Sequence, residues 1–258
     1  MSTNFNLSEE IQKVKVSIIT ITYNSASTIA DTMHSVASQT YPNIEHIIID
    51  GASKDNTLEI VKNFPHVAKL TSEPDKGIYN AMNKGVVAST GDVIGILNSD
   101  DFFSSNDVIE KIVSTFTTDT QVVFGDVSFV NADDLTKSVR YYSAKHWKPF
   151  KFRWGFMPPH PSCYIRRECF ADGGVYKEDY KISSDYELLT RFLYKNKYRY
   201  KYIHLNVVTM RQGGASTKNI NARYILNKEI VRACRENGIY TNLFMLTFKY
   251  FKKVFEYV

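Results

Sequence analysis

The chain has 258 residues and a formal net charge of +5, with 43% hydrophobic and 23% charged residues. This length allows one large α/β domain with an additional C-terminal subregion, and the composition is ordinary for a soluble globular protein. Three cysteines without metal-site spacing argue against a disulfide framework and favour a reducing cytoplasm. The first residues lack a charged-then-apolar signal pattern, and no apolar run reaches the roughly 18 residues that span a bilayer, so we expect a cytoplasmic protein.

Basic residues are unevenly placed. Lysine and arginine are frequent from Lys145 onward, interleaved with tyrosine and phenylalanine. Such a surface suits nucleic acid, an anionic membrane or phosphorylated substrates. Because no nucleic-acid-binding motif is present, we expect no nucleic-acid partner.

The first half of the chain alternates strand and helix patterns. Strands are predicted where β-branched and apolar residues run together, at 14–22, 44–50, 67–71, 93–97 and 122–130. Between them, apolar residues recur at helical spacing. This alternation predicts a mostly parallel, Rossmann-like sheet flanked by helices. No glycine-rich fingerprint follows the first strand, which argues against dinucleotide-binding and P-loop sites.

Polar side chains follow the predicted strands at the carboxyl edge, where open α/β sheets bind ligands. Asp50 ends the second strand, before a glycine that permits close backbone approach, and we expect it to meet a ribose or base edge. Asp75 and Lys76 precede the next helix, in position for a base or a phosphate. Asp55 either caps the helix that follows it or contacts a ligand, and the sequence leaves both roles open.

The strand at 93–97 leads into two adjacent carboxylates, Asp100 and Asp101. Two buried like charges are costly unless a cation neutralises them. Hard oxygen ligands suit Mg²⁺ or Mn²⁺ carrying a diphosphate. The alternative is a solvated acidic turn that caps the following helix.

From about residue 133 the pattern loosens into a hairpin turn, an aromatic and basic stretch, and a proline-rich segment at 157–162. A helix then opens at Ser183-Ser184-Asp185, where capping is the alternative role of these polar residues. A strand at 198–210 leads to Arg211, Gly213 and Gly214. This glycine turn is able to offer backbone amides and a guanidinium to phosphate.

Two further helices are predicted at 220–237 and 241–258, the first ending at Gly238. On the second, one face carries the aromatic residues Phe244, Phe248, Phe251 and Phe255, and another carries lysines. Packing on the domain and lying on an anionic membrane are both consistent with this pattern. We place a domain boundary after residue 216, with 217–258 as a helical extension associated with a membrane or an acceptor.

Together these segments resemble a family 2 glycosyltransferase of the GT-A fold. The resemblance covers about residues 14–216 and rests on motifs in the family's order: VSIITITYN, IIIDGASKDNT, EPDKGIYNAMNKG, GDVIGILNSDDFF, PHPS, SSDYELLTRF and GGAS. The whole set is most similar to bacterial enzymes that build extracellular or capsular polysaccharide. The resemblance implies a GT-A sheet flanked by helices, with a C-terminal helical extension.

The resemblance also implies roles for matching residues. The donor nucleotide would be bound by Thr22, Tyr23, Asp50, Asp75, Lys76, Asn83 and Ser99. Asn98-Ser99-Asp100 stands where the family has D-x-D, so Asp100 would hold the metal, with Asp101 as a neighbouring acid. Asn98 departs from the pattern, which leaves a ribose or metal contact open. His160 falls where a histidine reaches the metal, the diphosphate or the acceptor, and fixing the proline-rich loop is its alternative role.

The implied reaction is inverting transfer from a nucleotide-sugar donor, with Asp185 as general base and Mn²⁺ or Mg²⁺ as cofactor. Arg211, Gly213 and Gly214 would close over the diphosphate. Uridine diphosphate is the commonest carrier in the family, and guanosine and thymidine carriers are alternatives. The transferred group would be a hexosyl or N-acetylhexosaminyl unit. A saccharide or lipid-linked oligosaccharide at the inner membrane face would be the acceptor.

Two other functions remain open on the sequence. A sugar-1-phosphate nucleotidyltransferase would need a glycine-rich basic loop after the first strand, where this chain has Tyr23-Asn24-Ser25. A catalytically silent carbohydrate-binding protein is compatible with Asn98, although it would not need both Asp100 and Asp185.

Overall fold

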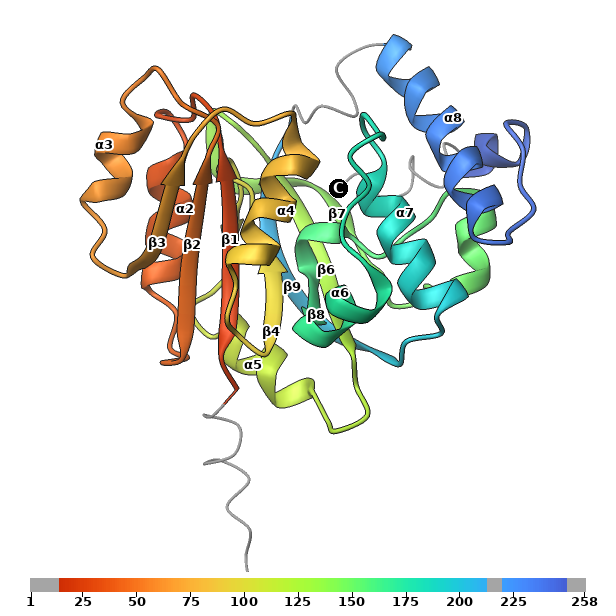
Figure 1. Cartoon of the computed structure of the whole chain (residues 1–258), viewed down its shortest axis with the longest axis horizontal. Coiled ribbons are helices and arrows are strands. Elements are labelled where there is room, and N and C mark those ends of the chain that lie inside the picture. Colours follow the sequence, from red (N-terminus) through yellow and green to blue (C-terminus); the bar gives the residue numbers. More distant parts are fainter. Residues whose placement is uncertain (1–13, 213–219, 250–258) are drawn as a thin grey trace, which may run out of the picture.

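The computed structural model describes residues 14–212 and 220–249. Within them, one nine-stranded sheet is flanked by helices (Figure 1). The strands are β1 (Val16–Thr22), β2 (Ile44–Asp50), β3 (Val67–Ser72), β4 (Val93–Ile96), β5 (Phe102–Phe103), β6 (Val122–Asn131), β7 (Asp134–Tyr142), β8 (Cys163–Arg166) and β9 (Tyr200–Arg211).

The helices are α2 (Ile29–Ala37), α3 (Thr57–Lys62), α4 (Ile78–Ala88), α5 (Val108–Thr115), α6 (Arg167–Gly173), α7 (Ser184–Thr190) and α8 (Ile220–Glu236). Short 3₁₀ helices are η1 (Pro149–Trp154), η2 (His160–Ser162) and η5 (Met245–Thr247), and a π-helix, η3 (Arg191–Lys195), continues α7. Among the described residues, no helix combines the length and apolar character needed to cross a bilayer.

The sheet has the order β3-β2-β1-β4-β8-β6-β9-β5, with β7 paired to β6. β3, β2, β1 and β4 are parallel, as the alternation of strands and helices predicts. β8 runs antiparallel to β4 and β6, and β5 antiparallel to β9, while β6 and β9 are parallel. The predicted α/β class is therefore confirmed, but the sheet is mixed rather than mostly parallel.

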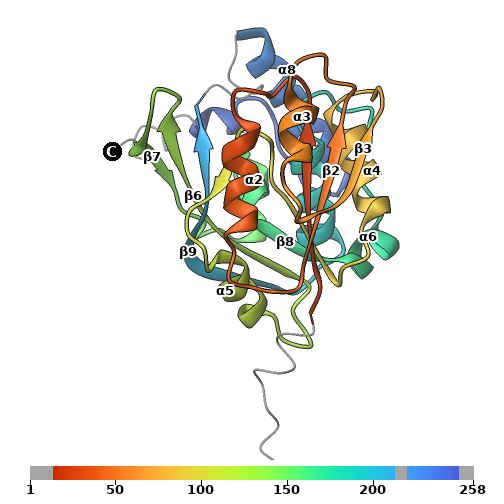
Figure 2. The ribbon, with the colours of Figure 1, turned by 90° about the vertical axis from the view of Figure 1, so that its left-hand side faces the viewer.

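Helices cover both faces of the central strands, whose successive side chains point in opposite directions. Ile19 and Ile47 pack on the side of α4, whereas Ile18 and Ile48 pack on the side of α2, α3 and α5. Figure 2 shows α2 and α4 on opposite sides of these strands. Because both faces are covered, β1 is buried along its whole length, which fits its β-branched, mostly apolar sequence.

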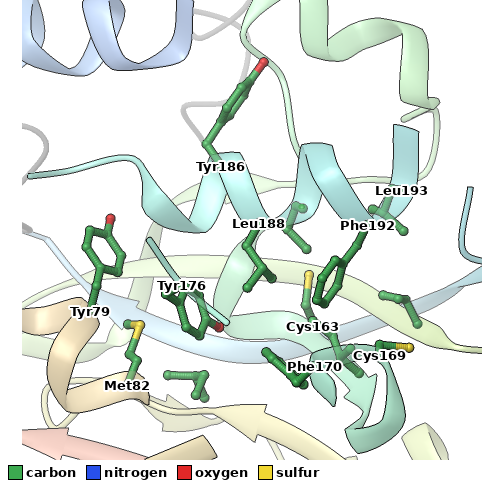
Figure 3. Packing of buried hydrophobic residues seen from close by; sticks show 14 of the residues in the cluster. Tyr79, Met82, Cys163, Cys169, Phe170, Tyr176, Tyr186, Leu188, Phe192 and Leu193 are labelled. Atoms are coloured by element: carbon green, nitrogen blue, oxygen red, sulfur yellow. The ribbon is translucent and has the colours of Figure 1, made fainter. Parts of the chain in front are cut away.

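A second part of the core surrounds α7. Leu188 and Phe192 are fully buried, as predicted, and Figure 3 shows them on the side of Phe170 and Cys163. The helix α6, which carries Phe170, was not predicted, because seven residues with two buried side chains give almost no periodicity. The helical spacing of Ile78, Ala81, Met82, Gly85 and Val86 predicts one inner face for α4, but Ile78 is 45% exposed and the buried face begins one residue later.

The C-terminal segment shares this core. Ile230, Cys234 and Leu246 belong to the same buried cluster as Leu188 of α7. The boundary proposed after residue 216 therefore separates segments with a common core, and it remains a prediction. α8 ends before Gly238, whose φ of 78° fits the predicted glycine end signal. Of the second C-terminal helix, the described part is the short η5 with two further helical residues, and 250–258 lie outside the described residues.

Candidate active site

The turns after β1 and β2 are tied together by side-chain hydrogen bonds. The N–H of Asn24 donates to Ser53 Oγ at 2.8 Å, and the N–H of Ala26 donates to the Asp55 carboxylate at 3.0 Å. The Thr57 hydroxyl donates to the same carboxylate at 2.5 Å, and this bond is the main cause that lowers the pKa of Asp55. Asp55 therefore stabilises the turn. Of the two roles that the sequence left open, this contact fits the structural role rather than contact with a ligand.

Asp50 is fully buried at the end of β2. Its carboxylate accepts hydrogen bonds from the N–H and hydroxyl of Ser53, at 3.0 and 2.5 Å, and from the hydroxyl of Ser72 at 2.6 Å. These bonds engage both oxygens and fix the turn that follows β2. A direct contact between Asp50 and a nucleoside stays a prediction.

Tyr23 and Asp75, which the sequence placed in separate segments, lie together over Gly51. A Cβ atom on Gly51 would be 2.5 Å from Asp75 Oδ2 and 3.4 Å from the Tyr23 ring, so a residue without a side chain is needed there. Tyr23 is 58% exposed, and Asp75 Oδ1 accepts the N–H of Gly77 at 2.8 Å. An exposed aromatic face beside a carboxylate offers a nucleobase both stacking and a hydrogen-bond acceptor.

The acidic segment after β4 contains two carboxylates in different environments. Asp100 is exposed, whereas Asp101 is 1% exposed and accepts a hydrogen bond from Asn98 Nδ2 at 3.1 Å. Burial, followed by the charge of Asp100, raises the pKa of Asp101 well above its usual range. Asn98 therefore supplies a donor where the D-x-D pattern would add a third carboxylate.

Ser99 and Arg211 hold this segment in place. Ser99 Oγ lies 2.8 Å from Ser25 Oγ, which connects the segment to the turn after β1. Arg211 Nη1 donates to the Asp100 carbonyl at 2.7 Å, Nη2 pairs with Asp31, and the guanidinium lies 5.3 Å from the centre of the Phe102 ring. The predicted contact of Arg211 with a diphosphate would require these bonds to change. Gly213 and Gly214 lie outside the described residues.

Asp185 lies in the first turn of α7, and Tyr79 of α4 reaches it. The Tyr79 hydroxyl donates to Asp185 Oδ1 at 3.4 Å, and the N–H of Tyr186 donates to the same oxygen at 2.8 Å. Because α4 begins just after Asp75, this contact brings Asp185 to the same edge as the other predicted residues. Burial raises the pKa of Asp185, while His160 opposes the shift. The alternative role of the serines as caps is wrong, since α7 starts without a side-chain capping bond.

His160 and Tyr176 are buried close to Asp185. His160 Nε2 lies 2.8 Å from the Tyr176 hydroxyl, and the Tyr176 ring stacks on that of Tyr79 with centroids 6.1 Å apart. Figure 3 shows the two tyrosines side by side. Burial lowers the pKa of His160, which favours the neutral ring. This contact fits the loop-fixing role of His160 better than the role of metal ligand.

Two residues of this group, Tyr79 and Tyr176, were not predicted. Tyr79 carries a signal, because it directly follows the Asp75–Gly77 turn on the buried face of α4. Tyr176 carries none, since it lies in an irregular segment far along the chain.

Asn83 and Lys76 differ in how they are engaged. The Asn83 side chain exchanges two hydrogen bonds with the backbone of Tyr176, both at 2.9 Å, and Nδ2 also donates to Glu178 at 3.0 Å. Asn83 therefore ties α4 to the segment before α7, and nucleotide binding by this amide stays a prediction. Lys76 is exposed beside Asp75, as expected for a contact with a ligand.

Buried polar atoms without partners mark the same edge. Among the described residues, these atoms include Thr22 Oγ1, Asn98 Oδ1, Ser183 Oγ and Ser184 Oγ. A buried polar atom without a partner costs about 1–3 kcal/mol, so such atoms in a native structure indicate a water or a ligand. They lie at the ends of β1 and β4 and at the start of α7, where the donor and the base are predicted.

The residues at this edge suit a divalent cation that takes some of its ligands from the protein and the others from a substrate. Asp100 offers a carboxylate that accepts no hydrogen bond from any described residue, and Asn98 Oδ1 is a second hard oxygen without a partner. Within 14–212 and 220–249, no three His, Cys, Asp or Glu side chains converge. One or two carboxylates, completed by phosphate oxygens and water, is a usual way for proteins to bind Mg²⁺.

The fold is that of the GT-A glycosyltransferases, to which similar solved structures belong. The structure of S. aureus TarS 1-349 in complex with UDP-GlcNAc has a TM-score of 0.66 at 17% identity, over 88% of this chain and 68% of that one. The mannosyltransferase PcManGT from Pyrobaculum calidifontis, in complex with GDP-Man and Mn²⁺, has a TM-score of 0.62 at 20% identity, over 86% and 64%.

The profile described as Glycosyl transferase family 2 matches residues 17–174. An uncharacterized glycosyltransferase of Mycobacterium tuberculosis (strain ATCC 25618 / H37Rv) is 32% identical over 182 residues, 68% of either chain. The chain therefore belongs to glycosyl transferase family 2, as its motifs predicted. A PGL/p-HBAD biosynthesis glycosyltransferase of Mycobacterium bovis (strain BCG / Pasteur 1173P2) is 26% identical over 216 residues, 81% of this chain and 82% of the relative.

Proposed function

We propose that the protein transfers a hexosyl or N-acetylhexosaminyl group from a nucleoside diphosphate sugar to an acceptor hydroxyl, with inversion at the anomeric carbon. One observation carries this proposal. Two carboxylates at the same edge have opposite environments: Asp100 is exposed, and burial raises the pKa of Asp185. An exposed carboxylate suits a cation and a diphosphate, whereas a carboxylate with a raised pKa suits proton abstraction.

The donor nucleoside is proposed to stack on Tyr23, with Asp75 accepting a hydrogen bond from the base. Lys76 lies next to Asp75 and carries a charge suited to phosphate. Uridine is the carrier that we favour, in line with the UDP-GlcNAc complex of the structurally similar TarS. Guanosine is the alternative carrier, in line with the GDP-Man complex of PcManGT.

Asp100 is the residue that would hold Mn²⁺ or Mg²⁺, with Asn98 Oδ1 close by in sequence. A bound divalent cation would neutralise the charge that develops on the diphosphate leaving group. The protein's own contribution is to keep Asp100 in place, which Arg211 does through the Asp100 carbonyl.

Asp185 is proposed to act as the general base. It takes the proton of the acceptor hydroxyl while the acceptor oxygen forms a bond to the anomeric carbon. The bond from that carbon to the diphosphate oxygen breaks, and its electron pair leaves with the nucleoside diphosphate. The Tyr79 hydroxyl, 3.4 Å from Asp185 Oδ1, orients the carboxylate. This single displacement requires no covalent intermediate with the enzyme.

A saccharide or lipid-linked acceptor in surface polysaccharide synthesis is the proposed partner. The M. bovis relative is named for PGL/p-HBAD biosynthesis, which supports a surface glycoconjugate. Aromatic and apolar side chains are exposed near the C-terminal end of the described chain: Tyr240, Leu243, Phe244 and Phe248. We propose that they attach the protein peripherally to the inner face of an anionic membrane.

Nucleotide binding tests the donor site. Thermal shifts are measured with uridine, guanosine and thymidine diphosphates, each with and without Mn²⁺, since a ligand that binds only the folded state raises its stability. We expect one nucleotide to raise the melting temperature only when Mn²⁺ is present, and Asp100→Asn to abolish that dependence. Equal shifts without the metal, or an unchanged response of Asp100→Asn, would contradict the assigned role of Asp100.

Membrane attachment is tested by substituting exposed aromatic residues rather than by deleting the segment from residue 241 onward. Such a deletion would also remove Leu246, which is buried in the core. Replacing Tyr240 and Phe244 by serine should weaken binding to phosphatidylglycerol vesicles by ~10-fold or more, since each buried aromatic side chain contributes about 2 kcal/mol. Val87→Ser removes a comparably exposed apolar side chain from α4 and serves as the control. Equal partitioning of both variants and the wild type would exclude this surface.

A further inference from the structure

The backbone just before α7 is held by a carboxylate from α8. Glu229 accepts hydrogen bonds from the N–H groups of Lys181 at 2.6 Å, Ile182 at 2.9 Å and Ser183 at 2.9 Å. N–H groups at the start of a helix lack partners within the helix, and successive amides form concave sites for anions. The two oxygens of Glu229 thus satisfy three consecutive amides that end one residue before α7.

Within the described chain, no side chain close in sequence to α7 caps its start in place of Glu229. α7 begins without a side-chain capping bond, and the hydroxyls of Ser183 and Ser184 are buried without partners. The position of this backbone therefore depends on a residue 46 to 48 positions further along the chain. Asp185 lies two residues after the last of these amides, so a shift of the segment moves its carboxylate.

The other charged contacts of α8 engage side chains at 177–180, and one of these, Lys177, also pairs with Glu187 of α7 at 3.1 Å. Arg232 pairs with the Asp179 carboxylate, and Glu236 accepts from the Tyr180 hydroxyl at 2.9 Å and from Lys177 at 2.7 Å. These contacts attach the loop before residue 181 to α8, but none of them involves the backbone N–H groups of residues 181–183. The charge of Glu229 also acts on Tyr79, whose pKa is raised by burial, by Asp185 and, to a smaller extent, by Glu229.

We propose that Glu229 is a positioning residue for glycosyl transfer, which fixes the backbone at 181–183 and thereby the carboxylate of Asp185. The inference rests on the proposed function, in which Asp185 is the base. It makes α8 part of the catalytic machinery rather than an appended element. A displacement of about 1 Å at a reacting group can reduce a rate by ~10²-fold, which sets the size of the expected effect.

Glu229→Gln tests this role with minimal change of shape, because the new amide keeps one acceptor oxygen and turns an N–H donor toward backbone N–H groups. Turnover is followed as UDP release from UDP-GlcNAc and UDP-glucose, with octyl hexopyranosides as acceptors. We expect kcat to fall by ~10- to 100-fold, while the donor KM and the UDP dissociation constant stay within about twofold. Glu229→Asp, which keeps the charge, should recover part of kcat.

Glu236→Gln is the matched control, since it removes a carboxylate from the same helix without touching the backbone at 181–183. It should keep kcat within about threefold, in the range of a peripheral contact rather than a positioning one. Amide hydrogen exchange at 181–185 should accelerate in Glu229→Gln and not in Glu236→Gln. Unchanged exchange, equal losses of kcat in both variants, or a parallel loss of UDP affinity would overturn the proposal. Absence of transfer by the wild-type chain would instead contradict the proposed function, and the exchange measurement would still decide the role of Glu229.

Discussion

Two groups of residues at the carboxyl edge of the sheet differ in their exposure to solvent, and therefore in how well they accommodate charge. The donor edge, formed by Tyr23, Asp75, Asn98 and Asp100, is largely open to solvent. The base cluster, formed by Tyr79, His160, Tyr176 and Asp185, is largely enclosed. Burial raises the pKa of Asp185 and of both tyrosines and lowers that of His160, so the cluster favours neutral forms.

In the proposed reaction, this difference would separate two tasks. A solvated carboxylate keeps its charge and suits a cation and a diphosphate, whereas a carboxylate with a raised pKa accepts a proton more readily. The two groups are also supported differently. Hydroxyls and amides of the adjoining turns hold the donor edge, together with the Arg211 guanidinium from β9. The base cluster is held by α4 and α8.

The largest effect is expected for Asp185→Asn, which removes the base and keeps the shape. Transfer should fall by ~10²- to 10⁴-fold, the usual contribution of a general base, while the nucleotide dissociation constant stays nearly unchanged. Since burial raises the pKa of Asp185, its ionised form destabilises the folded state at neutral pH, and the variant should melt no lower than the wild type. A comparable loss of nucleotide affinity would show that the two tasks are not separate, and unchanged transfer would favour a binding protein.

A smaller effect is expected for Gly51→Val at the donor edge. The added side chain would collide with Asp75 Oδ2 and the Tyr23 ring, so nucleotide affinity should fall by about 10-fold. This fall corresponds to ~1.4 kcal/mol, which lies within the range of about 1–3 kcal/mol that overpacking usually costs. The rate at saturating donor should remain close to that of the wild type. Isothermal titration with the nucleotide and initial rates measure both quantities, and Val87→Ala is a neutral exposed control. A selective fall in the saturated rate would argue against the assignment of this surface to the nucleoside.

The smallest effect is expected for Tyr79→Phe in the base cluster. The Tyr79 hydroxyl lowers the pKa of Asp185 by donating a hydrogen bond, so its removal should raise that pKa further. The acid limb of the kcat profile should then move to higher pH, with a loss of about 3- to 10-fold on the acid side for one weak hydrogen bond and little loss above the limb. A uniform loss at all pH values would indicate a packing defect instead.

The donor edge was largely predictable because its residues follow local patterns. β1 to β4 are short apolar runs, and the polar residues after them are adjacent in sequence, so the topology of parallel strands brings them together. In the base cluster, the family motifs pointed to Asp185 and His160, but not to Tyr79 or Tyr176. The contact between Tyr79 and Asp185 joins residues 106 positions apart, and that between Lys181 and Glu229 joins residues 48 apart. Such contacts depend on the packing of whole helices, and the sequence of either segment alone does not show which residue of the other it meets.

The common core of α7 and the C-terminal segment has a consequence for the order of synthesis. Because the ribosome makes β1 to β9 before α8, the strands of the sheet are all synthesised before Ile230, Cys234 and Leu246 leave the exit tunnel. Until then the apolar side of α7 has no partner from the C-terminal segment. A nascent chain can therefore fold its sheet before α8 is available to hold the segment that carries Asp185.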